Sequence, residues 1–413
     1  MDAAARSRIA DPSLAPVGEQ RIAWVARHSP VLNTLARGRL ADGALRGRRV
    51  AVVVHLEAKT AYLALLLAEA GAHVVAAGSN PASTQDAICA ALVARGVEVH
   101  ARQGANADEF HADLLAVADT EPEIVIDDGC ELTARIVEHR PELARRLAGV
   151  TEETTTGVAR LRALAAAARL AFPAIAANDA RCKHLFDNRY GTGQSTLAAI
   201  DRLTNLNFAG REFCIVGYGW VGKGLSRYAR GQGGRVTVVE VDPVAALEAH
   251  MDGHRVAPLE LALPDADMVI AATGAIDAVP ADAIALLKHG VVLANGGHHE
   301  RELAVDALGP GVEVRPGVTE HELSDSRRVY VLVDGRQTNV AGGDGHPVEI
   351  MDLSFSVQAL SAHLLARGGL EPGLHGFPPE LDADIARTKL ATLGIELGER
   401  TAKQREFEAR WSV

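Results

Sequence analysis

The sequence lacks several features that would place it in a familiar class of protein. Among its 413 residues are only four cysteines, Cys89, Cys130, Cys182 and Cys214, and no two of them form a Cys-x-x-Cys pair. Such spacing predicts neither a disulfide framework nor a zinc site. No apolar run reaches the length of a membrane-spanning helix, and the first 16 residues lack the apolar core of a secretory signal. We therefore expect no metal and a cytoplasmic location.

The chain also lacks an excess of positive charge. It carries 42 lysines and arginines against 53 aspartates and glutamates, a formal net charge of −11. Because negative charge repels nucleic acid and anionic membranes, we expect neither as the main partner. Low-complexity linkers and short internal repeats are absent too. The remaining composition, 48% hydrophobic and 23% charged, is that of a soluble globular protein large enough for at least two cores.

What the chain does contain is two series of β-branched segments that alternate with helix-like stretches. The first series comprises 49–55, 72–78, 97–101 and 123–129, and the second comprises 213–216, 235–240, 267–271, 290–294 and 329–335. Alternation at this spacing predicts parallel, doubly wound sheets. We therefore predict an α/β protein with two Rossmann-like units. A helix is expected over 346–366, where Pro347 suits a first helical turn.

The segment FCIVGYGWVGKG, residues 213–224, carries the strongest local signal. Gly217 permits a tight turn, Gly219 lets the backbone approach a pyrophosphate, and Gly222 lets the helix pack closely on the strand. The helix start then offers free N–H groups to the phosphates. Glu240 ends the next strand, where its carboxylate would accept hydrogen bonds from a ribose diol and repel a 2′-phosphate. A tight turn without a ligand would explain the glycines, but it would not explain the strand before them, the helix after them and Glu240 together. The sequence therefore predicts bound NAD rather than NADP.

Polar residues follow the strands of the first series as well. His55 follows one strand, Asp127 and Asp128 another, and Asn178 and Asp179 the segment AFPAIAA. Each has a structural explanation, such as a buried histidine or a turn. In an open parallel sheet, however, ligands bind beyond the carboxyl ends of the strands. The joint placement therefore predicts a second ligand site for the substrate, on which the nicotinamide would act across a cleft.

Blocks along nearly the whole chain resemble S-adenosylhomocysteine hydrolase. They are HLEAKTA (55–61), SNPASTQD (79–86), IDDG (126–129), GVTEETTTGV (149–158), KHLFDNRYGTGQS (183–195), VGYGWVGKG (216–224), ANGGH (294–298) and GDGHPVEIMDLSF (343–355). The short archaeal and thermophilic-bacterial type of this family is most similar, since it carries HLEAKTA and lacks the long Lys/Tyr-bearing tail. The resemblance implies a substrate unit at 1–190 and 345–395 with C-terminal helices, an inserted NAD unit at 191–344, a short tail at 396–413, and a homotetramer.

The resemblance also implies a redox-neutral cycle on a nucleoside. Bound NAD oxidises the 3′-hydroxyl to a ketone, which acidifies the C4′ proton. A base removes that proton, and the 5′ substituent leaves by elimination. Water then adds to the 4′,5′-alkene and the stored hydride reduces the ketone, so NAD is regenerated in each turnover.

By the same resemblance, the blocks contribute three groups of site residues. The implied catalytic residues are Lys183 and Asp187 for the 3′-hydroxyl proton, Asp128 near C4′, Glu153 at the ribose hydroxyls, and His55 and His298 for the leaving group and water. The implied substrate-binding residues are Glu57, Lys59, Thr60, Asn178, Asn188, His299, His346 and Met351, the last two beside the purine. The implied cofactor-binding residues are Thr154, Thr155, Thr156, Gly217, Gly219, Trp220, Val221, Gly222, Glu240 and Asn339. Imidazole both gives and takes protons near neutral pH, and a lysine beside a carboxylate and NAD⁺ can act as a base.

The family pattern changes on the 5′ side of the expected nucleoside. The usual Gly-His-Phe ends in His299, and the usual Asp-Asp-Gly-Gly-Asp ends in Cys130 and Glu131. Away from this side, Ala245 replaces an asparagine that the long form uses near the adenosine ribose of NAD. The leaving-group pocket is therefore the part of the site that the sequence defines least.

Three functional hypotheses follow from these changes. The first is hydrolysis of S-adenosylhomocysteine or its inosine analogue. The second is a nucleoside dehydratase, which would lose water from a 5′-hydroxyl and release a 4′,5′-unsaturated nucleoside, with His299 protonating the hydroxide. The third is a catalytically silent regulator that senses NAD or nucleoside. The third is disfavoured, because no matched catalytic position is lost.

Overall fold

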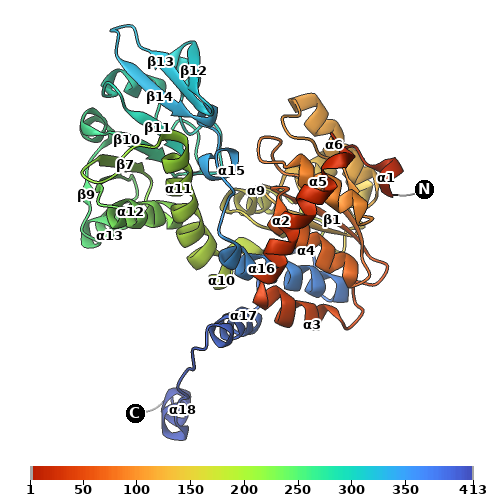
Figure 1. Cartoon of the computed structure of the whole chain (residues 1–413). Coiled ribbons are helices and arrows are strands. Elements are labelled where there is room, and N and C mark those ends of the chain that lie inside the picture. The colour runs from red at the N-terminus through yellow and green to blue at the C-terminus, as the bar shows by residue number, and fades with distance from the viewer. Residues whose placement is uncertain (1–2, 412–413) are drawn as a thin grey trace.

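Two α/β units make up the molecule, as Figure 1 shows for a computed structural model that describes residues 3–411. One unit contains a seven-stranded sheet in the order β15-β6-β5-β4-β1-β2-β3, and the other an eight-stranded sheet in the order β12-β13-β14-β11-β10-β7-β8-β9. The predicted α/β class with two doubly wound units is confirmed. No helix among the described residues is long and apolar enough to cross a membrane.

The first unit has a fully parallel sheet that is covered on both faces. Its strands are β1 (Arg49–Val54), β2 (His73–Gly78), β3 (Glu98–Val99), β4 (Ile124–Asp127), β5 (Gly149–Glu152), β6 (Pro173–Ala176) and β15 (Gly373–Gly376). In β1, Val50, Val52 and Val54 pack into one core while Ala51 and Val53 pack into the other. This alternation explains the unbroken apolar run of the strand, since both of its faces are buried.

Helices of the first unit form a layer on each side of that sheet. One core includes residues of α2 (Ala15–Arg27), α4 (Ala58–Glu69), α5 (Asp86–Ala94) and α16 (Val348–Arg367), and the other includes residues of α6 (Ala107–Asp119), α7 (Glu131–His139), α8 (Pro141–Ala144) and α9 (Thr155–Ala166). Short helices α1 (Ala3–Arg6), α3 (Arg37–Leu40) and α10 (Arg181–Lys183) complete this part.

The second unit starts with α11 (Thr192–Thr204) and holds the glycine-rich turn. Its parallel strands are β7 (Glu212–Val216), β8 (Arg235–Val239), β9 (Arg255–Val256), β10 (Met268–Ala271), β11 (Val292–Asn295) and β14 (Arg328–Leu332), and β12 (Gly311–Arg315) and β13 (Val318–Glu322) add an antiparallel edge. Its helices include α12 (Trp220–Gly231), α13 (Pro243–Met251), α14 (Leu259–Ala262) and α15 (Thr338–Ala341). The N-terminus of α12 follows β7 directly, so it faces the cleft between the units.

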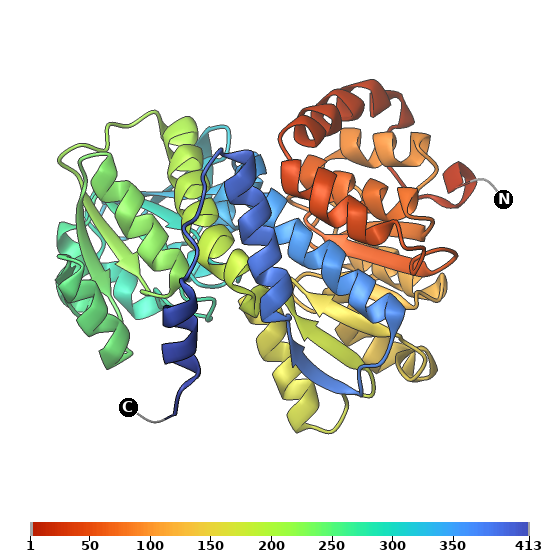
Figure 2. The ribbon, with the colours of Figure 1, turned by 90° about the horizontal axis from the view of Figure 1, so that it is seen from below.

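The chain returns to the first unit after the second is complete. Helix α16, expected over 346–366, begins at Val348, and Figure 2 shows it lying among the elements of the first unit. Strand β15 then pairs in parallel with β6. The last helices, α17 (Pro379–Thr392) and α18 (Ala402–Ala409), are joined by a segment that is exposed throughout, and α18 lies apart from the body of the first unit in Figure 1.

Candidate active site

All six residues expected to be catalytic line one small cavity between the two units. His55, Asp128 and Glu153 follow β1, β4 and β5, so three neighbouring strands of one sheet deliver them to one edge. Lys183 ends α10 and Asp187 lies in the π-helical segment 184–191 that follows it, and His298 comes from the second unit after β11. The cavity therefore requires both units.

Lys183 lies at the centre of a buried polar cluster. Its Nζ donates to Asn188 Oδ1 at 2.8 Å and lies 3.3 Å from carboxylate oxygens of Glu153 and Asp187. Burial alone would lower the pKa of Lys183, but the two carboxylates outweigh burial and hold it above the ordinary value. Burial would likewise raise the pKa of Asp187, yet Lys183 and then His346 hold it below the ordinary value. Lys183 and Asp187 therefore form an ion pair.

Glu153 differs from Asp187 although it lies beside the same lysine. Burial raises the pKa of Glu153, and the nearby Lys183 offsets only part of that effect. Its oxygens accept hydrogen bonds from Ser354 Oγ at 2.7 Å and Gln358 Nε2 at 2.5 Å. Sequence reasoning missed both partners, although they stand four residues apart on α16 and so share one helix face.

His55 and Asp128 form a second cluster at the other end of the cavity. Ser83 Oγ donates to Asn80 O at 2.9 Å, so His55 Nδ1, at 2.6 Å from the same oxygen, is the donor in that contact. In the neutral ring the lone pair then lies on Nε2, which is 3.6 Å from Asp128 Oδ2. Burial lowers the pKa of His55, and Asp128 opposes that effect only in part. His55 is therefore neutral near pH 7, with Nε2 free to accept a proton.

One carboxylate oxygen of Asp128 accepts a hydrogen bond, and the other has no partner. Ser79 Oγ donates to Oδ2 at 2.7 Å, whereas Oδ1 is buried without a partner. Burial would raise its pKa, but His55 and His298 together hold it below the ordinary value. An ionised carboxylate with an unpaired buried oxygen is suited to accept a proton. Ser79 and Ser83, which the analysis of the sequence did not single out, both lie in the block SNPASTQD.

Four more of the residues expected to bind the substrate, Glu57, Lys59, Thr60 and Met351, line the same cavity. Glu57 caps α4 by accepting from the N–H groups of Lys59 and Thr60, and Lys59 Nζ is 2.8 Å from Glu57 Oε2. Thr60 Oγ1 donates to His55 O at 2.6 Å, so it fixes the strand end. Met351 lines the cavity at the start of α16.

His346 and the two expected asparagines have different positions. His346 Nδ1 is 2.9 Å from Asp187 Oδ1, and its Nε2 is 3.0 Å from Thr192 Oγ1, so both ring nitrogens have partners. Asn188 Nδ2 donates to Asn178 Oδ1 at 3.0 Å, which continues the chain of bonds from Lys183. His299 does not line this cavity; it lines a neighbouring one of about 500 Å³ that also reaches His298.

A cavity of about 440 Å³ separates the glycine-rich turn from the first unit. Gly219, Trp220 and Val221 line one side, and Thr154, Thr155 and Thr156 line the other. Gly217 has φ +99°, and a Cβ at Gly222 would lie 2.0 Å from Gly217 O, so side chains are excluded at both positions. Asn339 donates to Ser195 Oγ at 3.1 Å while its buried Oδ1 has no partner. The turn and the unpaired Asn339 Oδ1 fit a dinucleotide, although Gly217, Gly222, Glu240 and Asn339 do not themselves line this cavity.

Glu240 and Thr154 have structural contacts beyond those expected. Glu240 accepts from the N–H groups of Tyr218, Val241 and Asp242 at 2.6 to 2.9 Å, so it also shapes the turn, with acceptor capacity left for a ribose. Thr154 caps α9 and donates to the buried Glu152. Glu152, which sequence reasoning missed, also accepts from the N–H groups of Gly129 and Cys130 and so joins the loops after β4 and β5.

No group of three or more metal-ligating side chains occurs in residues 3–411. The four cysteines are free and buried.

Comparison with known proteins identifies full-length relatives. Residues 6–144 match the family model for S-adenosyl-L-homocysteine hydrolase, and residues 188–345 match the model for the NAD binding domain of that enzyme. Over 410 residues the chain is 46% identical to S-inosyl-L-homocysteine hydrolase of Methanopyrus kandleri. The match covers 98% of this chain and 97% of that protein.

Two further relatives carry a different name at the same identity. Adenosylhomocysteinase of Thermococcus kodakarensis is 46% identical over 409 residues, covering 98% of this chain and 97% of that protein. Adenosylhomocysteinase of Thermotoga maritima is 46% identical over 400 residues, covering 95% and 99%. Sequence identity therefore does not choose between the two bases that these names imply.

Proposed function

This chain belongs to the S-adenosyl-L-homocysteine hydrolase family, and from that premise we propose which groups carry out each step of its reaction. It is an NAD-dependent hydrolase. We propose that its substrate is a purine nucleoside linked through sulfur to homocysteine. The observation that supports this most is the convergence of Lys183, Asp187, Glu153, Asp128 and the two histidines on one cavity. We place the NAD unit at 191–344 and the substrate unit at 1–190 and 345–395.

The first step removes the proton of the 3′-hydroxyl at Lys183. When bound, NAD supplies a hydride acceptor and a positive charge in the cleft, and such a charge favours the neutral amine of a nearby lysine. Asp187 and Asn188 hold the Lys183 Nζ in place. Burial raises the pKa of Glu153, so Glu153 is the neighbouring carboxyl group best able to share the proton of Lys183. Thr154 to Thr156, which line the cavity beside the glycine-rich turn, would hold the cofactor when it is bound, and the unpaired Asn339 Oδ1 would accept from its carboxamide.

Elimination and water addition take place at the Asp128 end of the cavity. The unpaired Oδ1 of Asp128 accepts the C4′ proton. His298 donates a proton to the leaving sulfur, and the neutral His55 removes a proton from the incoming water at its Nε2. Ser79 and Ser83 hold the carboxylate and the ring in these orientations.

The cavity beside His298 favours homocysteine over hydroxide as the leaving group. It measures about 500 Å³, and its lining includes Arg160, Arg301 and Arg336 together with Glu131 and Glu300. Guanidinium groups pair with a carboxylate and acidic groups pair with an ammonium, so the lining is complementary to an amino acid. A dehydratase would need no such space, because a departing hydroxide has only one non-hydrogen atom.

The base contacts support S-adenosylhomocysteine and also its inosine analogue as substrates. Glu57 offers acceptors and Lys59 offers donors at the same end of the cavity. Adenine presents an amino donor and the N1 acceptor, whereas hypoxanthine presents the O6 acceptor and an N1 donor. One donor and one acceptor in the protein can pair with either base, so we propose S-adenosylhomocysteine as the main substrate and S-inosylhomocysteine as the second.

A thiol assay with nucleoside mass spectrometry tests these assignments. The holoenzyme is incubated with S-adenosylhomocysteine, S-inosylhomocysteine and the two free nucleosides. Release of homocysteine with adenosine or inosine supports the hydrolase. A nucleoside that has lost water, with no thiol released, would instead identify a dehydratase. Absence of any conversion by protein that contains NAD would indicate a regulator.

We also propose that the protein is a tetramer in the cytoplasm. Exposed apolar side chains on the arm after α17 and on the outer face of α13 need a partner surface, and Leu397, Phe407, Val244 and Met251 are 65%, 72%, 73% and 75% exposed. Buried free cysteines agree with a reducing compartment. Light scattering should give four times the mass of one chain, and removal of residues after 393 should lower it; a monomeric full chain would contradict the proposal.

A further inference from the structure

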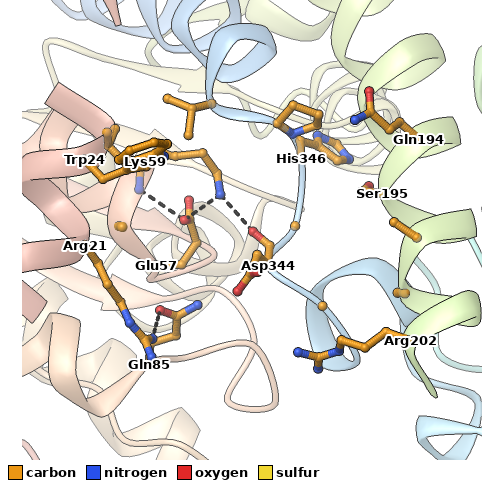
Figure 3. Close-up of a pocket in the computed structure, with 18 of the residues that line it drawn as sticks. Arg21, Trp24, Glu57, Lys59, Gln85, Gln194, Ser195, Arg202, Asp344 and His346 are labelled. Atoms are coloured by element: carbon orange, nitrogen blue, oxygen red, sulfur yellow. Dashed lines mark hydrogen bonds and ion pairs between the residues drawn. The ribbon is translucent and has the colours of Figure 1, made fainter. Parts of the chain in front are cut away.

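A cavity of about 630 Å³ adjoins the nucleoside cavity and has no part in the steps proposed above (Figure 3). One wall comes from α2 and the start of α4, and the other from α11 and the loop before α16. Glu57, Lys59, Gly345 and His346 line both cavities. These residues therefore form the partition between the two spaces.

The partition lies at the base end of the nucleoside cavity. His346 and Met351, which the family resemblance places beside the purine, line the nucleoside cavity together with Glu57 and Lys59. A purine bound there directs its six-membered ring toward Glu57 and Lys59. This orientation rests on the proposed function of the nucleoside cavity.

The side chain of Lys59 closes part of the partition by bridging Glu57 and the backbone of Asp344. Lys59 Nζ is 2.8 Å from Glu57 Oε2 and donates to Asp344 O at 2.9 Å, and Figure 3 shows these contacts at the edge of the cavity. A lysine side chain has several rotatable bonds, so Lys59 can move aside without a change of fold. A group attached to the six-membered ring of the purine would then enter the larger cavity.

The chemistry of the larger cavity indicates what such a group should carry. Arg21 on α2 and Arg202 on α11 come from opposite walls, and Figure 3 shows Arg202 reaching into the space between them. Arg21 donates to Gln85 at 3.0 Å and Arg202 donates to Gly342 O at 2.7 Å, which leaves N–H donors on each guanidinium. Because Glu57 is paired with Lys59, Asp344 is the remaining acid in the lining.

An apolar surface lies beside these cations. Trp24 is 59% exposed, stacks on His28 with ring centroids 4.1 Å apart, and lines the same cavity. Its indole would cover the stem of an attached group, and the guanidinium groups would pair with a terminal carboxylate.

We propose that this cavity is an extension site for a substituent on the exocyclic nitrogen of the purine, and that it selects a short apolar stem ending in a carboxylate. The protein then binds N6-substituted adenine nucleosides in addition to the unsubstituted nucleoside. Arg21 and Arg202 determine the preference for the carboxylate.

Equilibrium dialysis on the holoenzyme tests this with three probes: adenosine, N6-butyladenosine and N6-(3-carboxypropyl)adenosine. The carboxylated nucleoside should bind about tenfold more tightly than the butyl one, which corresponds to about 1.4 kcal/mol. Arg21→Gln combined with Arg202→Gln should remove that preference while leaving the affinity for adenosine unchanged. Arg235→Gln, a change at the exposed start of β8, is the matched control and should change none of the three affinities.

The outcomes separate this inference from the proposed function. If adenosine binds and neither substituted nucleoside does, the proposal of an extension site is wrong and the proposed function stands. If the double variant keeps the preference for the carboxylate, the assignment of Arg21 and Arg202 is wrong. If adenosine itself fails to bind to NAD-containing protein, the function proposed for the neighbouring cavity is wrong instead.

Discussion

At the scale of single residues, the cavity shifts the pKa values of groups of the same type in opposite directions. Lys183 holds Asp187 ionised, whereas burial raises the pKa of Glu153 beside the same ammonium. His55 is neutral although Asp128 lies 3.6 Å away, because burial outweighs that carboxylate. Proton acceptors and donors therefore coexist in one cavity, as alternating acid and base steps require.

Replacement of Lys183 and Asp128 should block different steps. Lys183→Ala should abolish the NADH absorbance that substrate generates on mixing, because the 3′-hydroxyl keeps its proton. Asp128→Asn should still form NADH but stop before elimination. Loss of a proton-transfer group costs about 10²- to 10⁴-fold in rate, so each block should be measurable by single-turnover absorbance. A deuterium label at C4′ follows the second step; if both variants form NADH and lose the label at the normal rate, the assigned roles are wrong.

Removing the charge of Asp128 should also change the titration of His55. Asp128 raises the pKa of His55 against the effect of burial, so Asp128→Asn should lower that pKa further. The neutral ring would then persist to more acidic pH than in the unmodified protein. NMR titration of labelled histidines measures the shift, with His55→Gln to identify which resonance belongs to His55. An upward shift of the His55 pKa would show that Asp128 does not act on this ring.

Cys130 occupies a backbone conformation that favours glycine. Its φ is +60° and its side chain is fully buried at the start of α7. Left-handed backbone costs a non-glycine residue about 1–2 kcal/mol, whereas loss of the buried thiol and a more flexible unfolded chain oppose the gain from glycine. Cys130→Gly should therefore change the free energy of unfolding by less than about 1 kcal/mol, while a β-branched Cys130→Val should lower it by about 2 kcal/mol or more. Urea unfolding measures both, and equal effects would refute this account.

At the scale of elements, short segments after parallel strands carry most of the chemistry. The turn after β7 starts α12 at the cleft, and the π-helical segment 184–191 follows directly on Lys183 and carries Asp187 and Asn188. Such π-helical turns often occur at functional sites. The loops after β4 and β5 are tied together by Glu152, so Asp128 and Thr154 are positioned as one group.

The start of α12 should tolerate no side chain at Gly222. A Cβ there would lie 2.0 Å from Gly217 O, so Gly222→Ala must push the helix away from β7. The variant should lose copurified NAD, which we expect at about one per chain in the unmodified protein, as one dinucleotide turn implies. Gly231→Ala in the same helix is the matched control, because nothing lies within 4 Å of its Cβ position. Acid release and chromatography measure the nucleotide, and full retention by Gly222→Ala would contradict the prediction.

At the scale of the whole molecule, one unit is contained within a single stretch of chain and the other is not. Both cores of the second unit consist of residues between Leu197 and Val333. The main core of the first unit combines residues from Ile22 to Cys182 with residues from Met351 to Ile385. The cleft therefore lies where the chain crosses between the units twice.

Fragments should reflect this difference. A fragment of residues 191–344 should fold alone, unfold cooperatively and bind NAD, although more weakly because Thr154 to Thr156 are missing. A fragment of residues 1–190 should not fold, because it lacks α16, which is buried from Met351 to His363, and β15. Circular dichroism during thermal unfolding measures both. Cooperative unfolding of the 1–190 fragment would show that the returning segment is dispensable.

Much of this organisation follows from the sequence by itself. Runs such as RVAVVV, buried on both faces, predict parallel strands, and the glycines after β7 with Glu240 predict NAD, because local sterics and apolar alternation determine such features. Motif blocks also indicated six of the residues that line the cavity between the units. Shorter elements were missed: β5 contains the polar Thr151 and Glu152, and β12 is exposed along its length, so neither forms an apolar run.

Other features were decided only by the tertiary structure. Ser354 and Gln358 contact Glu153 across some 200 positions of sequence, and Lys59 reaches the backbone of Asp344 across 285. Contacts of such separation depend on how two sheets and a returning helix pack, and no local pattern encodes that packing. The pKa shifts of His55 and Glu153 and the second cavity beyond Lys59 depend on the same packing, because burial and cavity shape are properties of the assembled chain.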